Sequence, residues 1–208
     1  MKLTRVQIDK IAATIKANPA AFRSFLEAES NSQGFSEITG KIIIQFEPSY
    51  FKKTYKDWQK SDKNSVWLNN PVGNQTVEWK AFNDAYKLSP AAAMKSTSIG
   101  AGQVMGYHYA RLGFKTVNEM WDFAKGWDGK TYSNDRGEYN QVVLIALFIK
   151  TDPRLLKIMQ KPELTLSDFD LIAKYYNGLY YKELAIKLDR EPYDKTMFKY
   201  YNHFKAAA

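Results

Sequence analysis

Apolar residues at helical spacing run through most of this chain, and this pattern constrains the fold more than any other feature. The spacing is present in residues 1–17, returns from Pro19 to about Ser30, and is nearly continuous from Thr76 to the C-terminus. The segment KIIIQFE at residues 41–47 is β-branched and apolar, and it is the clearest strand of the sequence. We therefore expect a mainly α protein with one small strand-containing region.

Turn and capping signals indicate how the helices are divided. Asn18 predicts an N-cap for the helix that begins at Pro19, and Gly178 predicts the end of the helix that precedes it. The mixed segment from Lys52 to Gln75 contains NNPVGN, which predicts an irregular lobe next to the strand. Two glycines in STSIGAGQ, residues 96–103, predict a break, after which VMGYHYARLGF, residues 104–114, should continue as helix. A length of 208 residues suits one substantial core. We expect one domain over residues 1–208, with a small β-containing lobe at about residues 35–75.

Composition narrows the possible partners. The chain has 30 Lys and Arg against 22 Asp and Glu, a net charge of +8, which favours polyanions such as nucleic acid, anionic membranes or cell-wall polymers. It has no cysteine, so disulfides and thiolate metal sites are excluded. His108 and His203 lie far apart, and neither has a second ligand at metal-binding spacing in its own helix. We expect no metal and no cofactor.

Targeting signals are not evident either. The N-terminal segment alternates charged and apolar residues, unlike the uninterrupted apolar core of a signal peptide. Apolar runs elsewhere fall far short of the ~20 residues that a membrane span needs. We expect neither a signal peptide nor a transmembrane segment.

One acidic residue stands out in the helix that begins at Pro19. Phe22, Phe25 and Leu26 follow the spacing of a single apolar stripe, and the next member of that stripe is Glu29. At about 100° per residue, Glu29 lies within ~20° of Phe22, whereas Glu27 points ~140° away and should be solvated. A carboxyl on an apolar face holds its proton near neutral pH, as a general acid must. The alternative from periodicity alone is a structural Glu at a helix end.

Several short segments follow one another in a recognisable order. They are AESNSQGF at 28–35, IIIQFEPSYF at 42–51, SIGAGQVMG at 98–106, KYYNGLYY at 174–181 and YDKTMFKYY at 193–201. In this order they resemble the lysozyme superfamily, and among its members the N-acetylmuramidase family of phage endolysins. The resemblance spans roughly residues 7 to 204. It implies a lysozyme-like α+β fold in which a helical lobe and a small β-containing lobe flank a cleft.

The resemblance also implies roles for particular residues. Glu29 would be the general acid that protonates the glycosidic oxygen, and Glu47 the second acidic position, which stabilises the oxocarbenium ion or positions water. Glu37 and Asp57 remain alternatives to Glu47, and a surface carboxylate remains the alternative reading of Glu47 itself. The expected substrate-binding residues are Ser30, Gln103, Met105, Tyr176 and Asn177. Gln103 could be a solvated turn residue instead, and Tyr176 and Asn177 a core tyrosine and a helix cap.

The function implied by this resemblance is hydrolysis of the β-1,4 bond between N-acetylmuramic acid and N-acetylglucosamine in peptidoglycan. A lytic transglycosylase, which gives a 1,6-anhydro product, and a non-catalytic binder of cell wall or nucleic acid are the alternatives. We expect a monomer whose partner is bacterial peptidoglycan, with electrostatic contact to the anionic envelope and no nucleic acid. The resemblance to endolysins implies that the protein is located in the host cytoplasm before its release to the periplasm and cell wall.

Overall fold

The computed structural model describes residues 3–30, 33–69 and 74–206, without the side chains of Ser30 and Asn69. These residues form eleven α-helices and one three-stranded antiparallel sheet, so the expected mainly α fold is confirmed. The chain divides into two compact units. We call residues 33–144 the sheet unit, and residues 3–30 with 145–206 the helical unit. No helix in the described part of the chain is long and apolar enough to cross a membrane.

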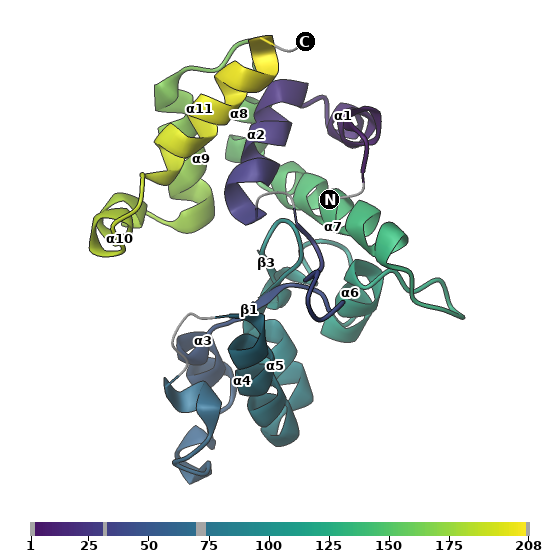
Figure 1. Ribbon diagram of the computed structural model, residues 1–208, viewed down its shortest axis with the longest axis vertical. Helices are drawn as coiled ribbons and strands as arrows, with labels where there is room; N and C mark the ends of the chain where they lie inside the picture. The colour runs from purple at the N-terminus through teal and green to yellow at the C-terminus, as the bar shows by residue number, and fades with distance from the viewer. Residues whose placement is uncertain (1–2, 31–32, 70–73, 207–208) are drawn as a thin grey trace. The chain divides into compact units, whose positions relative to one another are not determined.

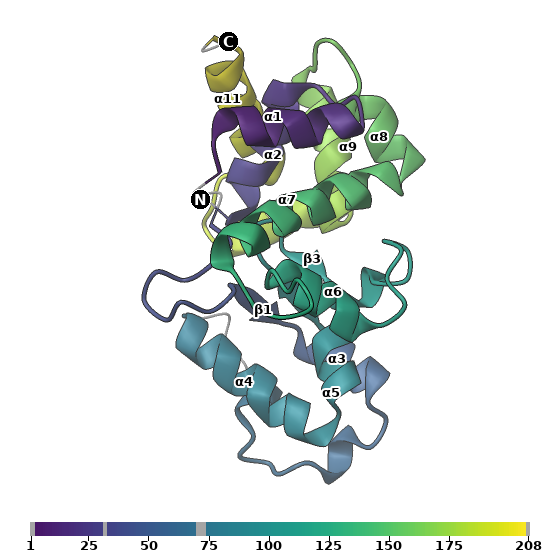
Figure 2. The same ribbon diagram turned by 90° about the vertical axis from the view of Figure 1, so that its right-hand side faces the viewer.

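The helical unit is built around α2. Its helices are α1 (Arg5–Thr14), α2 (Pro19–Ser30), the last part of α7 (Asn134–Lys150), α8 (Pro153–Met159), α9 (Leu166–Asn177), α10 (Tyr181–Lys187) and α11 (Tyr193–Ala206). Asn18 caps α2 as expected, because its Oδ1 accepts from the backbone N–H of Ala21 at 3.2 Å. Helix α11 packs against both α2 and α9, and the views in Figures 1 and 2 show α11 beside them.

The sheet unit surrounds three short strands. They are β1 (Ile44–Phe46), β2 (Thr97–Ile99) and β3 (Val104–Met105), in the order β1-β2-β3. The helices of this unit are α3 (Pro48–Thr54), α4 (Gln75–Leu88), α5 (Pro90–Lys95), α6 (Val117–Ala124) and the first part of α7, and the 3-10 turns are η1 (Trp58–Lys60), η2 (Val66–Asn69) and η3 (Gly106–His108).

The expected helix at residues 104–114 was wrong. Gly100 and Gln103 have φ values of +69° and +47°, so the chain turns back there and Val104 pairs with Ile99. A strand, a 3-10 turn and further turns replace the helix. As a result the sheet contains two strands that lie outside residues 35–75.

Candidate active site

Glu29 lies in the last turn of α2 and continues its apolar stripe. Phe22, Phe25 and Leu26 are no more than 1% exposed, and Glu29 follows them as a half-buried residue. Glu27, expected to be solvated, is also half-buried. The difference between the two glutamates therefore comes from what surrounds Glu29, as the following contacts show.

Tyr193, the first residue of α11, donates a hydrogen bond from its hydroxyl to Oε1 of Glu29. The start of α11 is fixed by the carbonyl oxygen of Pro192, which accepts from the N–H groups of Lys195 and Thr196. The next residue, Asp194, is buried and forms an ion pair with Lys182 of α10. The tyrosine is thus held rigidly against the end of α2.

The same surroundings control the proton on Glu29. Burial raises the pKa of Glu29 from 4.5 to about 8, and the hydrogen bond from Tyr193 opposes this rise. Burial also raises the pKa of Tyr193, and the charge of Glu29 adds to that rise, so the phenol stays protonated and can donate. A carboxyl that is protonated at neutral pH beside a fixed hydroxyl can act as a proton donor.

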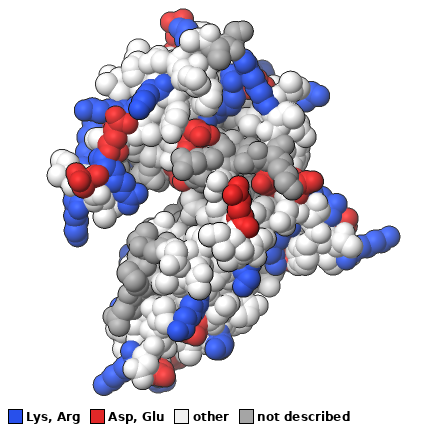
Figure 3. Space-filling model, in the orientation of Figure 1, with Lys and Arg blue, Asp and Glu red and all other residues white. Residues whose placement is uncertain are grey.

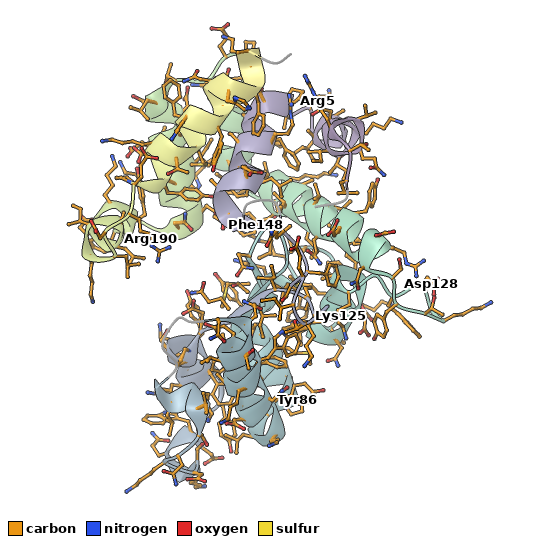
Figure 4. All side chains as sticks on the ribbon, in the orientation of Figure 1. Arg5, Tyr86, Lys125, Asp128, Phe148 and Arg190 are labelled. Atoms are coloured by element: carbon orange, nitrogen blue, oxygen red, sulfur yellow. The ribbon has the colours of Figure 1, made fainter. Side chains whose placement is uncertain are left out.

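The two predicted residues of the YNG turn lie at the end of α9. Tyr176 packs edge-on against Phe25, with ring centroids 4.6 Å apart, and against Phe148, labelled in Figure 4, at 4.9 Å. Asn177 is exposed in the last position of the helix. Tyr176 also acts electrostatically on Tyr193, which places it in the surroundings of Glu29. The side chain of Ser30, expected to bind substrate, lies outside the described residues.

Glu47 belongs to a polar face of the three-stranded sheet. Gln45 of β1 is paired with Ser98 of β2, which is paired with Met105 of β3. Opposed residues of antiparallel strands point to the same face, and Glu47 follows two positions after Gln45, so all four share one side. The opposite face carries buried residues, namely Ile44, Phe46, Thr97, Ile99 and Val104. The strands thus place the polar side chains of Gln45, Ser98 and Glu47 on one face, and the opposite face is buried and mostly apolar.

Glu47 is half-buried at the end of β1, and its Oε1 accepts from Nε2 of Gln45 at 3.0 Å. Burial raises the pKa of Glu47, the hydrogen bond from Gln45 opposes the rise, and the charge of Glu78 adds to it. Glu37 is exposed, and Asp57 is exposed and paired with Lys60 at 2.8 Å. These surroundings favour Glu47 over either alternative as a reactive carboxyl.

Gln103 is held within its own loop. Its Oε1 accepts from the hydroxyl of Ser98 at 2.8 Å, and its Nε2 donates to the carbonyl oxygen of Gly100 at 2.8 Å. An amide has two N–H groups and two lone pairs on its oxygen, so one of each remains for another group. The side chain is therefore fixed in direction and still able to bind.

Gln141 of α7 holds the loop at residues 100–103 in place. Its Oε1 accepts from the N–H of Ala101 at 2.8 Å, and its Nε2 donates to the carbonyl oxygen of Ala124 at 3.0 Å. A side chain at Gly100 would collide with the amide of Gln141, which explains the glycine at that position. Sequence reasoning missed Gln141. The signal was its place next to the apolar run at residues 142–149.

The predicted residues thus form two groups. Glu29, Tyr176 and Asn177 belong to the helical unit, and Glu47, Gln103 and Met105 to the sheet unit. No group of three His, Asp or Glu side chains suited to a metal occurs among the described residues. Burial lowers the pKa of His108 to about 4, so its imidazole is neutral at physiological pH.

The fold has a counterpart among solved structures. A crystal structure of the Burkholderia AP3 phage endolysin superposes with a TM-score of 0.75 at 24% sequence identity, over 99% of this chain and 72% of that chain. A search of curated proteins found no match. The sequence model of the N-acetylmuramidase family matches residues 18–205. The chain belongs to this family, which places it among peptidoglycan-degrading enzymes.

Proposed function

We propose that the protein is a phage endolysin that hydrolyses the β-1,4 bond between N-acetylmuramic acid and N-acetylglucosamine, with Glu29 as the general acid. The observation that carries this proposal is the position of Glu29, which ends an apolar stripe and accepts a hydrogen bond from Tyr193. A pKa of about 8 keeps the carboxyl protonated at neutral pH, where it can donate to the leaving oxygen.

The other site residues act on the sugar and on the developing positive charge. Glu47, in its ionised form, stabilises the oxocarbenium ion or orients the attacking water. Gln103 offers its free N–H and lone pair to an N-acetyl group, while Met105 contributes an apolar contact beside it. Tyr176, Asn177 and Ser30 hold the sugar near Glu29. No cofactor takes part, and the protein acts as a monomer in one catalytic domain.

Charge distribution supports a diffuse attraction to the anionic cell envelope. Lys and Arg side chains on the face drawn in Figure 3 are dispersed among acidic and uncharged ones. Over α9 and α10, for example, Asp170 pairs with Lys174 and Lys182 at 2.6 Å each. A nucleic-acid site is instead marked by a continuous basic stripe. The net charge of +8 then serves to bring the enzyme, made in the host cytoplasm, to its insoluble substrate.

Product analysis tests the reaction. Purified peptidoglycan digested with the protein should yield muropeptides with reducing N-acetylmuramic acid ends, because water attacks the activated carbon. Mass spectrometry distinguishes them from 1,6-anhydro ends, which are lighter by one water. Exclusively anhydro ends would show a lytic transglycosylase, and a lack of any released muropeptide would show a non-catalytic binder.

The hydrogen bond from Tyr193 predicts a directional change in the pH profile. Since this bond lowers the pKa of Glu29, Tyr193→Phe should move the alkaline limb of the activity profile, near pH 8 in the wild type, to higher pH. The rate on the plateau should fall roughly tenfold, because the bond from Tyr193 stabilises the carboxylate that forms as Glu29 gives up its proton, and a hydrogen bond to a charged group contributes ~1.5 kcal/mol. Rates of peptidoglycan clearing from pH 5 to 10 measure both effects.

The matched control is Tyr180→Phe, which removes the same hydroxyl from a 76% exposed ring of the helical unit. It should leave both the limb and the plateau unchanged. An alkaline limb that moves to lower pH in Tyr193→Phe would contradict the assignment of that limb to Glu29.

A further inference from the structure

The outer edge of β1 is closed by side chains of α4 instead of a fourth strand. Gln75 accepts from the N–H of Ile44 and donates to its carbonyl oxygen, both at 2.9 Å. The indole N–H of Trp79 donates to the carbonyl oxygen of Ile42 at 3.1 Å. These bonds satisfy backbone groups that an open strand edge would leave unpaired.

The third contact of this edge uses a charged group. Oε2 of Glu78 accepts from the N–H of Phe46 at 2.9 Å, and the residue is only 1% exposed. Phe46 immediately precedes Glu47, whose own N–H donates to the carbonyl oxygen of Ser96 at 2.8 Å. The backbone that carries Glu47 is thus fixed on one side by Glu78 and on the other by the chain entering β2.

A carboxylate is a costly choice for this position. Gln75 bonds to Ile44, two residues before Phe46 on the same edge, and shows that a neutral amide can accept from a backbone N–H there. Burial of a charged carboxyl is unfavourable unless the group is paired and hydrogen-bonded. The bond from the N–H of Phe46 offsets part of that cost, and the charge of Glu78 also acts on Glu47, to which the proposed reaction gives a role.

We propose that Glu78 is a positioning residue for Glu47: it fixes the end of β1 from which Glu47 projects and places a second negative charge beside it. The inference rests on the proposed role of Glu47 in the reaction. Glu78 does not contact substrate in this scheme. It acts only through the position of Glu47 and through the pH at which Glu47 ionises.

The groups around Glu47 make the direction of the effect clear. Gln45 of β1 donates to Glu47 and favours its ionised form, whereas Glu78 of α4 disfavours it. The neighbouring strand β2 contributes Thr97, Ser98 and Ile99, none of which is charged. Loss of the charge at Glu78 should therefore let Glu47 ionise at lower pH.

The test is Glu78→Gln, which keeps an oxygen to accept from Phe46 and removes the charge. In protein with ¹³C-labelled glutamate, NMR should show that the titration midpoint of the Glu47 carboxyl moves to lower pH. The resonance is assigned by its loss in Glu47→Gln. In the proposed reaction the ionisation of Glu47 sets the acid limb of the activity profile. That limb should move to lower pH by the same amount, while the alkaline limb, set by Glu29, remains in place.

Glu119→Gln is the matched control. Oε2 of Glu119 also accepts from a backbone N–H, that of Lys115 at 2.9 Å, but it does so on the exposed surface of the sheet unit. This variant should leave the titration of Glu47 unchanged. If Glu78→Gln does not fold, Glu78→Asp decides, because it keeps the charge but withdraws the carboxylate from the N–H of Phe46. This variant should lower the plateau rate and leave the acid limb of the activity profile in place.

The outcomes separate this inference from the proposed function. An NMR shift without a change in the activity profile would support the coupling and contradict the role of Glu47 in the reaction. A folded Glu78→Gln protein with an unshifted Glu47 midpoint overturns the inference, and so does a Glu78→Asp protein with the wild-type plateau rate. In either of those cases the assignment of Glu29 as the acid is untouched.

Discussion

Glu29→Gln should lower the rate of peptidoglycan clearing by at least ~100-fold, since a general acid typically contributes 10²- to 10⁴-fold to a reaction rate. The amide is nearly the same size as the carboxyl but has no proton to give to the glycosidic oxygen. It can still accept the hydrogen bond from Tyr193, so the local structure should be retained. The rate is measured as loss of turbidity of a purified peptidoglycan suspension.

Two measurements make this result specific. Glu27→Gln makes the same change two residues earlier in α2 and should keep the wild-type rate. Sedimentation with insoluble peptidoglycan should remain unchanged in Glu29→Gln, because binding does not need the proton. A Glu29→Gln protein that clears peptidoglycan at the wild-type rate would show that Glu29 is not the acid.

Local sequence patterns predicted much of the helical structure. Asn18 and Pro19 placed the start of α2, and its apolar spacing placed Glu29 on the buried stripe. Gly178 was expected to end α9, and the helix ends at Asn177. Each of these predictions depends on interactions within one turn or one face of a helix, which the sequence contains directly.

The same periodicity also indicates Glu78. Ala81, Phe82 and Ala85 follow it at the spacing of one helix face, and all four residues are buried. A search for acidic residues on apolar stripes would therefore have found Glu78 along with Glu29. Its partner, the N–H of Phe46, could not have been deduced, because that contact joins a helix to a strand 32 positions earlier.

Contacts between distant segments account for what the sequence did not reveal. Tyr193 meets Glu29 across 164 positions, and no local pattern encodes that pairing. The strands β2 and β3 were missed because they have three and two residues, too few to show alternation, and depend on pairing with β1. Short strands form through their partners more than through their own composition.

The buried carboxyl at Glu29 should also reduce stability at alkaline pH. In the unfolded chain it ionises near pH 4.5, whereas in the folded protein it keeps its proton up to about pH 8. A raised folded-state pKa contributes stability that is complete below pH 4.5 and is lost as the pH rises through 8. The full difference, 8 − 4.5, corresponds to on the order of 5 kcal/mol at ~1.4 kcal/mol per pH unit.

Glu29→Gln has no such ionisation. At pH 8.5 its free energy of unfolding should therefore exceed that of the wild type by several kcal/mol. The difference should shrink as the pH falls and vanish near pH 4, where both side chains are neutral in the folded and unfolded states. Urea unfolding at pH 4, 6 and 8.5 measures this difference, with Glu27→Gln as a variant that should show no comparable trend.

Equal stability of Glu29→Gln and the wild type at pH 8.5 would mean that Glu29 ionises freely in the folded protein. In that case it could not hold a proton for catalysis at neutral pH, so one stability measurement tests the electrostatic basis of the proposed mechanism without any substrate.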